Sequence, residues 1–303
     1  MGAGHSHARP SGHAGARYRM RLAIAFALTA TFFVVELVAG LLSGSLALLS
    51  DAGHMGADVV ALGAVLLATI IAPRPDGTGR RTFGRYRVEI FASGLAALIM
   101  LGMGVYVLVE AVRRLGSDGP VGTGTMLLVG ALGLAVNVAS LLLLRAGSSE
   151  SLAVRGAYLE VLADAAGSVG VIVAALLMQA TGSTAWDLVV AVAIAVFILV
   201  RAVALARQVL AVLAQHAPAG VDPAEVEAQL AALGDVEEVH DLHLWTLTSG
   251  MDVGTVHLVV ASEADHAEVL DDARRVMLEG HGVEHVTVQI EPAGLVGCRE
   301  LGW

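Results

Sequence analysis

Six long apolar runs constrain this chain more than any other feature, because each is about as long as a helix that crosses a membrane. With 56% hydrophobic and 15% charged residues and a mean hydropathy of +0.74, the chain is too apolar for an ordinary soluble domain. The sequence therefore predicts an α-helical membrane protein with six transmembrane helices. The runs are Leu22–Leu42, Leu46–Ile71, Ile90–Val112, Met126–Leu144, Ala157–Met178 and Leu188–Ala206.

The first two runs are separated only by Ser43-Gly44-Ser45, which predicts a tight helical hairpin. The first run is longer than the apolar core of a cleavable signal, and no small-residue cleavage site follows it. We therefore expect it to remain as a membrane anchor.

Arginines predict the orientation of the helices. Only Arg113 and Arg114 lie on one side of the predicted membrane, and thirteen arginines lie on the other. Because positively charged loops stay in the cytoplasm, both termini are predicted to be cytoplasmic, in a multi-pass protein of the cell inner membrane. The thirteen are Arg9, Arg17, Arg19, Arg21, Arg74, Arg80, Arg81, Arg85, Arg87, Arg145, Arg155, Arg201 and Arg207.

The formal net charge of −10 belongs to the last part of the chain, where residues 217–303 hold 17 acidic residues against three arginines. An acidic segment disfavours nucleic acid as a partner and suits cations. Cys298 is the only cysteine, so a disulfide or a thiolate metal cluster within one chain is excluded.

Residues 217–303 read as a small cytoplasmic α/β domain. Asp222-Pro223 is typical of a helix start, and Ser249-Gly250 between two β-rich stretches is typical of a hairpin. The order helix, strand, strand, helix, strand (αββαβ) predicts a ferredoxin-like domain. The predicted elements are Ala224–Leu233, Val236–Leu247, Met251–Ala261, Ala264–Gly280 and His285–Ile290.

The domain organisation follows from these patterns. Residues 1–20 are expected to form a disordered leader containing histidines, 21–210 the six-helix transmembrane domain, and 217–303 the cytoplasmic domain. A domain as small as the last one buries a limited core, so pairing with a second copy is expected.

Two pairs of ionisable residues interrupt the apolar runs, namely His54 with Asp58 and Glu160 with Asp164. Residues four apart share one face of a helix, so two facing pairs offer four ligands. One imidazole and three carboxylates suit a divalent cation in tetrahedral coordination, with zinc as the first choice. The alternative is that these groups only pair with one another or with the backbone. Three acids and one base cannot neutralise one another without protons or a cation, which favours the metal site.

Charge suggests how such a site could move an ion. Three carboxylates beside a neutral histidine hold a charge of −3, so an empty site in an apolar bundle is expected to take up protons in place of the metal. If the site faces each side of the membrane in turn, metal leaves as protons enter. The hypothesis is a cation/proton antiporter.

Other polar residues in the apolar runs have open roles. Asp51 is either a packing or entry-path carboxylate or a further oxygen ligand for the metal. Glu36 and Asn137 either hydrogen-bond inside the bundle or line the ion path. Arg85 and Glu89, four residues apart, are expected to form a structural or gating ion pair.

The chain resembles the cation diffusion facilitator family in four segments, which come in the family's order and span nearly the whole chain. They are SGSLALLSDAGHM at Ser43–Met55, FGRYRVE at Phe83–Glu89, YLEVLAD at Tyr158–Asp164 followed by Gly167-Ser168, and VHDLHLW at Val239–Trp245. The resemblance implies a homodimeric, proton-coupled exporter of zinc and related divalent ions, with a transport site at His54, Asp58, Glu160 and Asp164. Many zinc-transporting members have histidine where this chain has Glu160, so the chain is more similar to the bacterial cobalt-zinc-cadmium subgroup, with cadmium or cobalt as further substrates.

The resemblance also implies a regulatory metal site in the cytoplasmic domain. By position, its candidates are His240, His257 and Glu291, with His266 and Asp265 less certain. Gln289 stands where some members have a histidine. Each of these histidines, taken alone, is more often a surface or core residue than a metal ligand.

Histidines in the leader, His5, His7 and His13, could capture metal weakly or could be without function. A membrane metalloprotease is disfavoured because no His-Glu-x-x-His motif is present. A membrane metal sensor would use the same ligands without moving the ion, and a channel would conduct without protons. The prediction is a transporter and not an enzyme, with no prosthetic group, and with lipid, metal ions, protons and a second copy as partners.

Overall fold

The computed structural model of the chain describes residues 14–71, 79–116, 120–145 and 152–293. Within these ranges, the side chains of 14–25, 61–62, 64–71, 143–145 and 152–160 lie outside the description. The leader histidines His5, His7 and His13 precede the described residues. The chain divides into two compact units, Met1–Arg207 and Gln208–Trp303.

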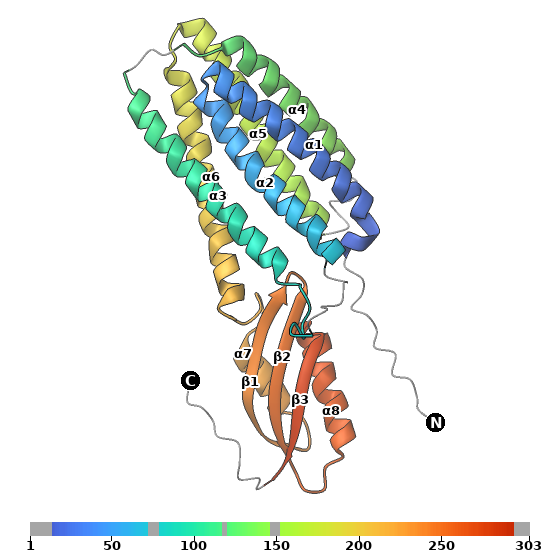
Figure 1. Cartoon of the computed structure of the whole chain (residues 1–303). Helices are drawn as coiled ribbons and strands as arrows, with labels where there is room; N and C mark the ends of the chain where they lie inside the picture. The colour runs from blue at the N-terminus through green and yellow to red at the C-terminus, as the bar shows by residue number, and fades with distance from the viewer. Residues whose placement is uncertain (1–13, 72–78, 117–119, 146–151, 294–303) are drawn as a thin grey trace. The chain divides into compact units, whose positions relative to one another are not determined.

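The first unit is a bundle of long helices, drawn from blue to yellow in Figure 1. Five of its helices, all but α2, have the length and the apolar composition to cross a membrane among the described residues. Large apolar side chains such as Leu98 and Val200 point outward, with 66% and 65% of their surface exposed. Such a surface fits contact with lipid. The helices are α1 (Ala14–Ser43), α2 (Leu46–Ile71), α3 (Val88–Arg114), α4 (Thr123–Arg145), α5 (Leu152–Thr181) and α6 (Ala185–Leu213).

Glycines let the helices approach one another closely. A Cβ atom added at Gly104 of α3 would lie 2.6 Å from Cγ of Leu199 in α6. One added at Gly133 of α4 would lie 2.7 Å from Cζ of Phe32 in α1. Small residues at such crossings are the usual device of helix packing in membranes.

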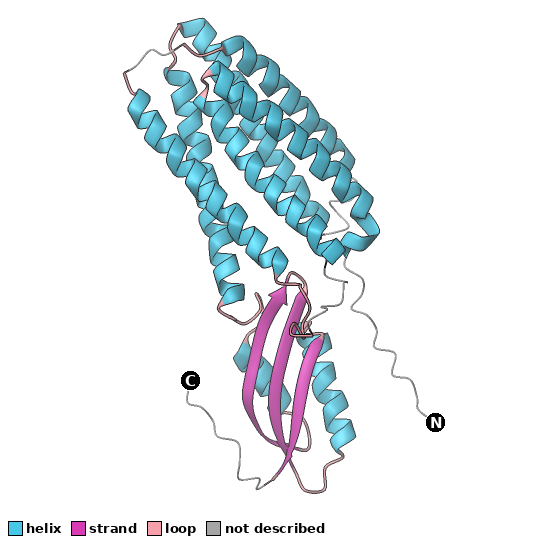
Figure 2. Ribbon diagram, in the orientation of Figure 1, coloured by secondary structure: helices cyan, strands magenta, loops and turns pink. Residues whose placement is uncertain are grey.

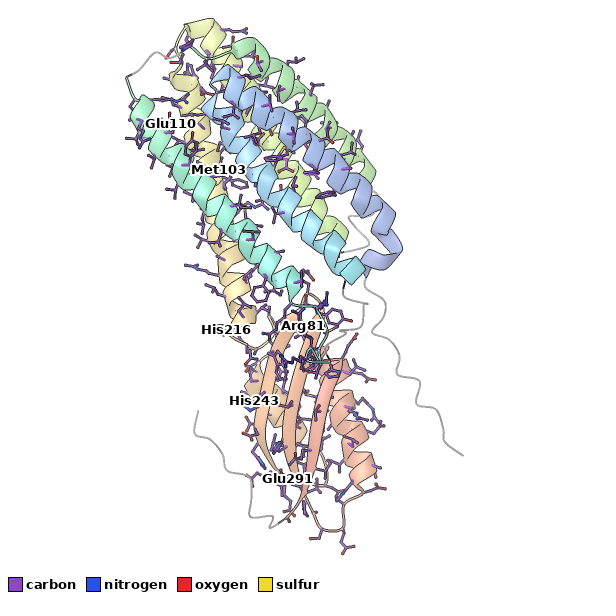
Figure 3. The ribbon with its side chains drawn as sticks, viewed as in Figure 1. Arg81, Met103, Glu110, His216, His243 and Glu291 are labelled. Atoms are coloured by element: carbon purple, nitrogen blue, oxygen red, sulfur yellow. The ribbon has the colours of Figure 1, made fainter. Side chains whose placement is uncertain are left out.

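The turn between α1 and α2 is as short as predicted. Gly44 has a φ of +71°, a left-handed conformation that glycine adopts without steric cost. Its carbonyl oxygen accepts a hydrogen bond of 2.6 Å from Arg114 at the end of α3. Nε of Arg114 also donates to Glu110, which lies one turn earlier on the same helix and is labelled in Figure 3. The last turn of α3 is thereby attached to the hairpin.

The start of α6 is attached to the start of α2 by Asp187, a side chain that is only 1% exposed. Its Oδ1 accepts hydrogen bonds from the Ser45 hydroxyl (2.6 Å) and the Ala47 N–H (3.2 Å). Its Oδ2 accepts one from the Leu46 N–H (2.7 Å). The first N–H groups of a helix have no partner within the helix and favour a negative charge. A carboxylate on one helix therefore caps another.

The second unit is a three-stranded sheet with helices on one face (Figure 2). The strand order is β1-β2-β3, with β1 and β2 antiparallel and β2 and β3 parallel. Val226 and Leu230 of α7 and Met277 of η1 share one apolar core with Val256 and Leu258 of β2. The elements are α7 (Pro223–Ala231), β1 (Val236–Thr248), β2 (Met251–Val260), α8 (His266–Arg275), the π-helical turn η1 (Val276–Gly280) and β3 (His285–Pro292).

Candidate metal centre

Three ionisable side chains of α2 and α5 meet inside the first unit. His54 and Asp58 lie one turn apart on α2, and Asp164 lies on α5. Nε2 of His54 is 3.1 Å from Oδ1 of Asp164 and 3.7 Å from Oδ2 of Asp58. One ligand atom from each of the three lies within 4.8 Å of the others. His54 is only 4% exposed, and the side chains of Asp58 and Asp164 are each 20% exposed.

The fourth predicted ligand, Glu160, lies one turn before Asp164 on α5. Its side chain is outside the described residues. Since residues four apart share a helix face, the backbone of α5 carries Glu160 and Asp164 on the same side.

The geometry at Nε2 of His54 requires a proton or a positive charge beside the carboxylates. Lone pairs of an imidazole nitrogen and a carboxylate oxygen 3.1 Å apart repel unless a proton or a metal ion lies between them. Imidazole nitrogen and carboxylate oxygen are common ligands of divalent transition metals. The group can therefore hold such an ion between α2 and α5.

Arg201 of α6 also reaches this group, which the sequence did not indicate. Its Nη1 lies 3.0 Å from Nε2 of His54. The arginine count of the sequence assigned Arg201 to the cytoplasmic end of the sixth helix. However, α6 continues to Leu213, so Arg201 lies well before the end of the helix.

Asp51 lies next to the group but is not among its three members. It is buried, with 5% exposed, and its carboxyl group lies close to that of Glu36 in α1. A Cβ atom added at Gly167 of α5 would lie 2.8 Å from Oδ1 of Asp51. Asp51 and the buried Glu36 thus join α1 to α2 beside α5.

The remaining membrane candidates lie on other helices. Asn137 of α4 donates a hydrogen bond of 3.5 Å to the hydroxyl of the buried Ser168 in α5. Arg85 lies in the turns before α3, and Glu89 lies in the first turn of that helix. Both are partly buried.

A second group of potential ligands lies on the sheet of the other unit. His240 on β1 is paired across the ladder with His257 on β2, and Glu291 follows near the end of β3 (Figure 3). Glu291 is 3% exposed. Its Oε1 is 3.0 Å from Nδ1 of His257, and its Oε2 is 3.5 Å from Nε2 of His240. Ligand atoms of the three lie within 4.8 Å of one another.

Gln289 adjoins this second group, because its amide nitrogen donates a hydrogen bond of 2.7 Å to Oε1 of Glu291. Two other candidates do not join it. Asp265 caps the start of α8 by accepting from the N–H groups of Ala267 and Glu268. His266 is exposed at the first position of α8.

Two family models cover the chain. The cation efflux transmembrane domain matches residues 22–214, and the cytoplasmic domain of cation efflux proteins matches residues 218–293. The chain belongs to the cation diffusion facilitator family of cation efflux proteins. The resemblance in its sequence motifs is thus confirmed, and the protein is a multi-pass membrane transporter of metal cations.

Several members of this family are similar to the chain over nearly its whole length. The metal cation efflux system protein CzcD of Cupriavidus metallidurans is 44% identical, over 97% of this chain and 91% of the relative. The zinc transporter ZitB of Escherichia coli is 37% identical, over 95% and 92%. A cadmium, cobalt and zinc/H(+)-K(+) antiporter of Bacillus subtilis is 32% identical, over 95% and 92%.

One solved structure, the metal-bound C-terminal domain of the CzcD transporter from Cupriavidus metallidurans, is 42% identical to this chain. The match covers 23% of this chain and 99% of the solved chain, with a TM-score of 0.23.

Proposed function

We propose that this protein is a proton-coupled antiporter that exports divalent metal cations from the cytoplasm, with zinc as the main substrate and cadmium and cobalt as further ones. The observation that carries the proposal is the convergence of ligand atoms between two helices, from the buried His54 and the partly buried Asp58 and Asp164. Glu160 supplies the fourth ligand in this proposal. The ion is cargo, and the site opens to each side of the membrane in turn.

The ligand set supports these substrates. One imidazole and three carboxylates give the four ligands that zinc takes in tetrahedral sites. A site with more oxygen than nitrogen ligands is harder than a site with two histidines, and it tolerates a wider range of ions. A relative named for cadmium, cobalt and zinc fits this range.

Proton coupling is supported by charge. An ion that leaves a buried anionic site has to be replaced by another positive charge, since isolated carboxylates are costly away from water. Protons are the simplest replacement. The Bacillus subtilis relative is named as an antiporter that involves H⁺.

The same proposal includes the membrane arrangement. In it, α2 is a sixth span, both termini face the cytoplasm as the arginine distribution predicts, and the protein lies in the cell inner membrane. Residues 21–210 form the transmembrane domain, and 217–303 form a ferredoxin-like cytoplasmic domain through which two copies pair. The second family model, named ZT_dimer, supports the homodimer.

Metal uptake into sealed everted vesicles tests the proposal. Vesicles with an acidic interior are expected to accumulate zinc, and each exchanged proton raises the accumulation about tenfold per pH unit. Potassium is kept equal on both sides, and a protonophore removes the gradient as a control. Cadmium, cobalt and manganese compete in turn to rank the substrates. Zinc flux that ignores the pH gradient would point to a channel and reject the antiporter.

We also propose that His240, His257 and Glu291 bind a regulatory divalent ion in the cytoplasmic domain. Neither ring nitrogen of His240 has a hydrogen-bond partner among the described residues, although the side chain is only 9% exposed. A buried imidazole that makes no hydrogen bond is costly, even with the Glu291 carboxylate 3.5 Å away. A metal ion held by the two histidines and Glu291 would give a ring nitrogen of His240 a bonding partner.

The Glu291→Gln variant tests the second site in the full-length protein. In equilibrium dialysis we expect this variant either to lose one zinc equivalent per chain or to bind it at least about 10–100-fold more weakly. Loss of a residue that only hydrogen-bonds to a metal ligand already weakens metal binding by that factor. Glu284→Gln is the matched control, because Glu284 is exposed just before β3. Equal stoichiometry and affinity in Glu291→Gln and the parent would reject the site.

A further inference from the structure

An arginine of α6 contacts the ring nitrogen of His54 that faces the carboxylates. Nη1 of Arg201 lies 3.0 Å from Nε2 of His54, and Nε2 is the same atom that faces the carboxylates of Asp58 and Asp164. A guanidinium has only donors and stays charged at any pH that proteins meet. A hydrogen bond from Arg201 to His54 therefore uses the lone pair of Nε2, the same lone pair that would bind a metal ion.

The course of the two helices explains the contact. Asp187 attaches α6 to the start of α2, so distances along both helices can be counted from that end. At about 1.5 Å per residue, His54 lies about 12 Å from Leu46, and Arg201 lies about 21 Å from Asp187. A long helical side chain runs back toward the N-terminus, and Cζ of Arg201 lies 5.8 Å from the ring centre of Phe197, one turn earlier. The guanidinium thus reaches the group from the C-terminal side of α6.

A metal ion and Arg201 cannot use His54 at the same time. A zinc–nitrogen bond of about 2.0–2.1 Å takes the lone pair of Nε2, which then has nothing left to accept the N–H of Arg201. Two cations at this distance also repel one another in a medium of low dielectric constant.

We propose that Arg201 is a tethered cation that occupies the metal position at His54 between transport cycles and is displaced when a divalent ion binds. The inference rests on the proposed transport site of α2 and α5. The displaced guanidinium remains attached to α6, and the carboxylates attract it back. Arg201 thereby weakens metal binding, favours metal release, and offsets one of the three negative charges after the ion has left, so that protons are still needed for the others.

Metal affinity of the purified full-length protein tests this role. Cd²⁺ binding is measured by equilibrium dialysis with and without the Asp58→Ala change. The difference between the two gives the binding that depends on Asp58 and excludes binding at the cytoplasmic site. We expect Arg201→Gln to bind Cd²⁺ at least about tenfold more tightly, because a neighbouring positive charge is gone. Arg201→Lys keeps the charge and is expected to stay within about threefold of the parent. Arg207→Gln, exposed on the same helix, is expected to have no effect.

The outcomes separate this inference from the proposed function. If Asp58→Ala removes no Cd²⁺ binding, the transport site itself is wrong. If Asp58→Ala removes binding but Arg201→Gln binds Cd²⁺ no more tightly than the parent, only the tethered cation is wrong. A purely structural role of Arg201 would lower the affinity and the thermal stability of both Arg201→Gln and Arg201→Lys.

A second measurement compares two charges on one folded variant. Arg201→Cys is prepared in a chain with Cys298→Ser, which removes the only native thiol. The new thiol is labelled with either a cationic aminoethyl or a neutral methyl methanethiosulfonate, and mass spectrometry gives the labelled fraction. We expect the cationic label to weaken the Asp58-dependent binding about tenfold relative to the neutral label. Equal affinities would overturn the inference.

Discussion

Replacing Asp58 with alanine is expected to abolish zinc flux into everted vesicles, as is the loss of any one of the four proposed ligands. The carboxylate of Asp58 lies 3.7 Å from Nε2 of His54, within the group that binds the ion in our proposal. Two unit charges 4 Å apart interact by about 4 kcal/mol at an effective dielectric constant near 20. Loss of one carboxylate ligand is therefore expected to weaken binding of a divalent ion roughly a thousandfold or more.

Two further variants make the Asp58 result specific. Asp58→Asn keeps the shape of the side chain without its charge and is expected to be as inactive as Asp58→Ala. Glu110→Gln removes a carboxylate that pairs with Arg113 and Arg114 on α3, away from the proposed ligands, and is expected to transport zinc normally. Substantial zinc flux in a well-folded Asp58→Asn protein would show that the ion does not pass through this group.

The Asp187→Ala variant is expected to show the largest loss of stability. It removes a buried carboxylate that accepts hydrogen bonds from Ser45, Leu46 and Ala47. Hydrogen bonds to charged groups contribute about 1.5–3 kcal/mol each, and the unpaired N–H groups of α2 stay buried. A net loss of about 3 kcal/mol lowers the unfolding midpoint by roughly 6–12 °C, by the scaling of soluble domains of similar length. Thermal unfolding of the detergent-purified protein measures it.

A nearby hydroxyl provides the matched control for Asp187. Ser183 accepts a hydrogen bond from the N–H of Ala185 at the exposed start of the same helix, so Ser183→Ala is expected to cost no more than about 1 kcal/mol. Ser45→Ala combined with Asp187→Ala should cost less than the sum of the two, because the pair acts as a unit. An unfolding midpoint within about 2 °C of the parent for Asp187→Ala would contradict the proposed capping role.

Local patterns in the sequence predicted the elements of the cytoplasmic unit closely. The predicted helices and strands begin and end within about two residues of the observed ones, because proline, glycine and β-branched residues mark their boundaries directly. The helix α2 has the bounds of its predicted run, Leu46–Ile71, and the other five helices of the first unit are longer than their apolar runs. For example, α6 is Ala185–Leu213, against a run of Leu188–Ala206, since polar residues continue a helix beyond its apolar part.

The candidate site was predictable where its geometry is local. His54 and Asp58 lie on one face because they are four residues apart, and the charge of Asp164 in an apolar run pointed to a partner. Arg201 and Asp187 were not predicted to contact α2, because their partners are more than a hundred residues away in the chain. The positive charge of Arg201 was used only to orient the helices. Its long side chain carries that charge back into the bundle.

The attachment of α6 to α2 at Asp187 also limits how the bundle can move. Any rearrangement that keeps those hydrogen bonds has to pivot about that end of the two helices. A relative tilt of about 10° moves a point about 12 Å along by about 2 Å and a point about 21 Å along by nearly 4 Å. With α2 as the reference, the backbone at Arg201 on α6 moves by the larger of these distances relative to His54, which lengthens the contact between the arginine and the imidazole.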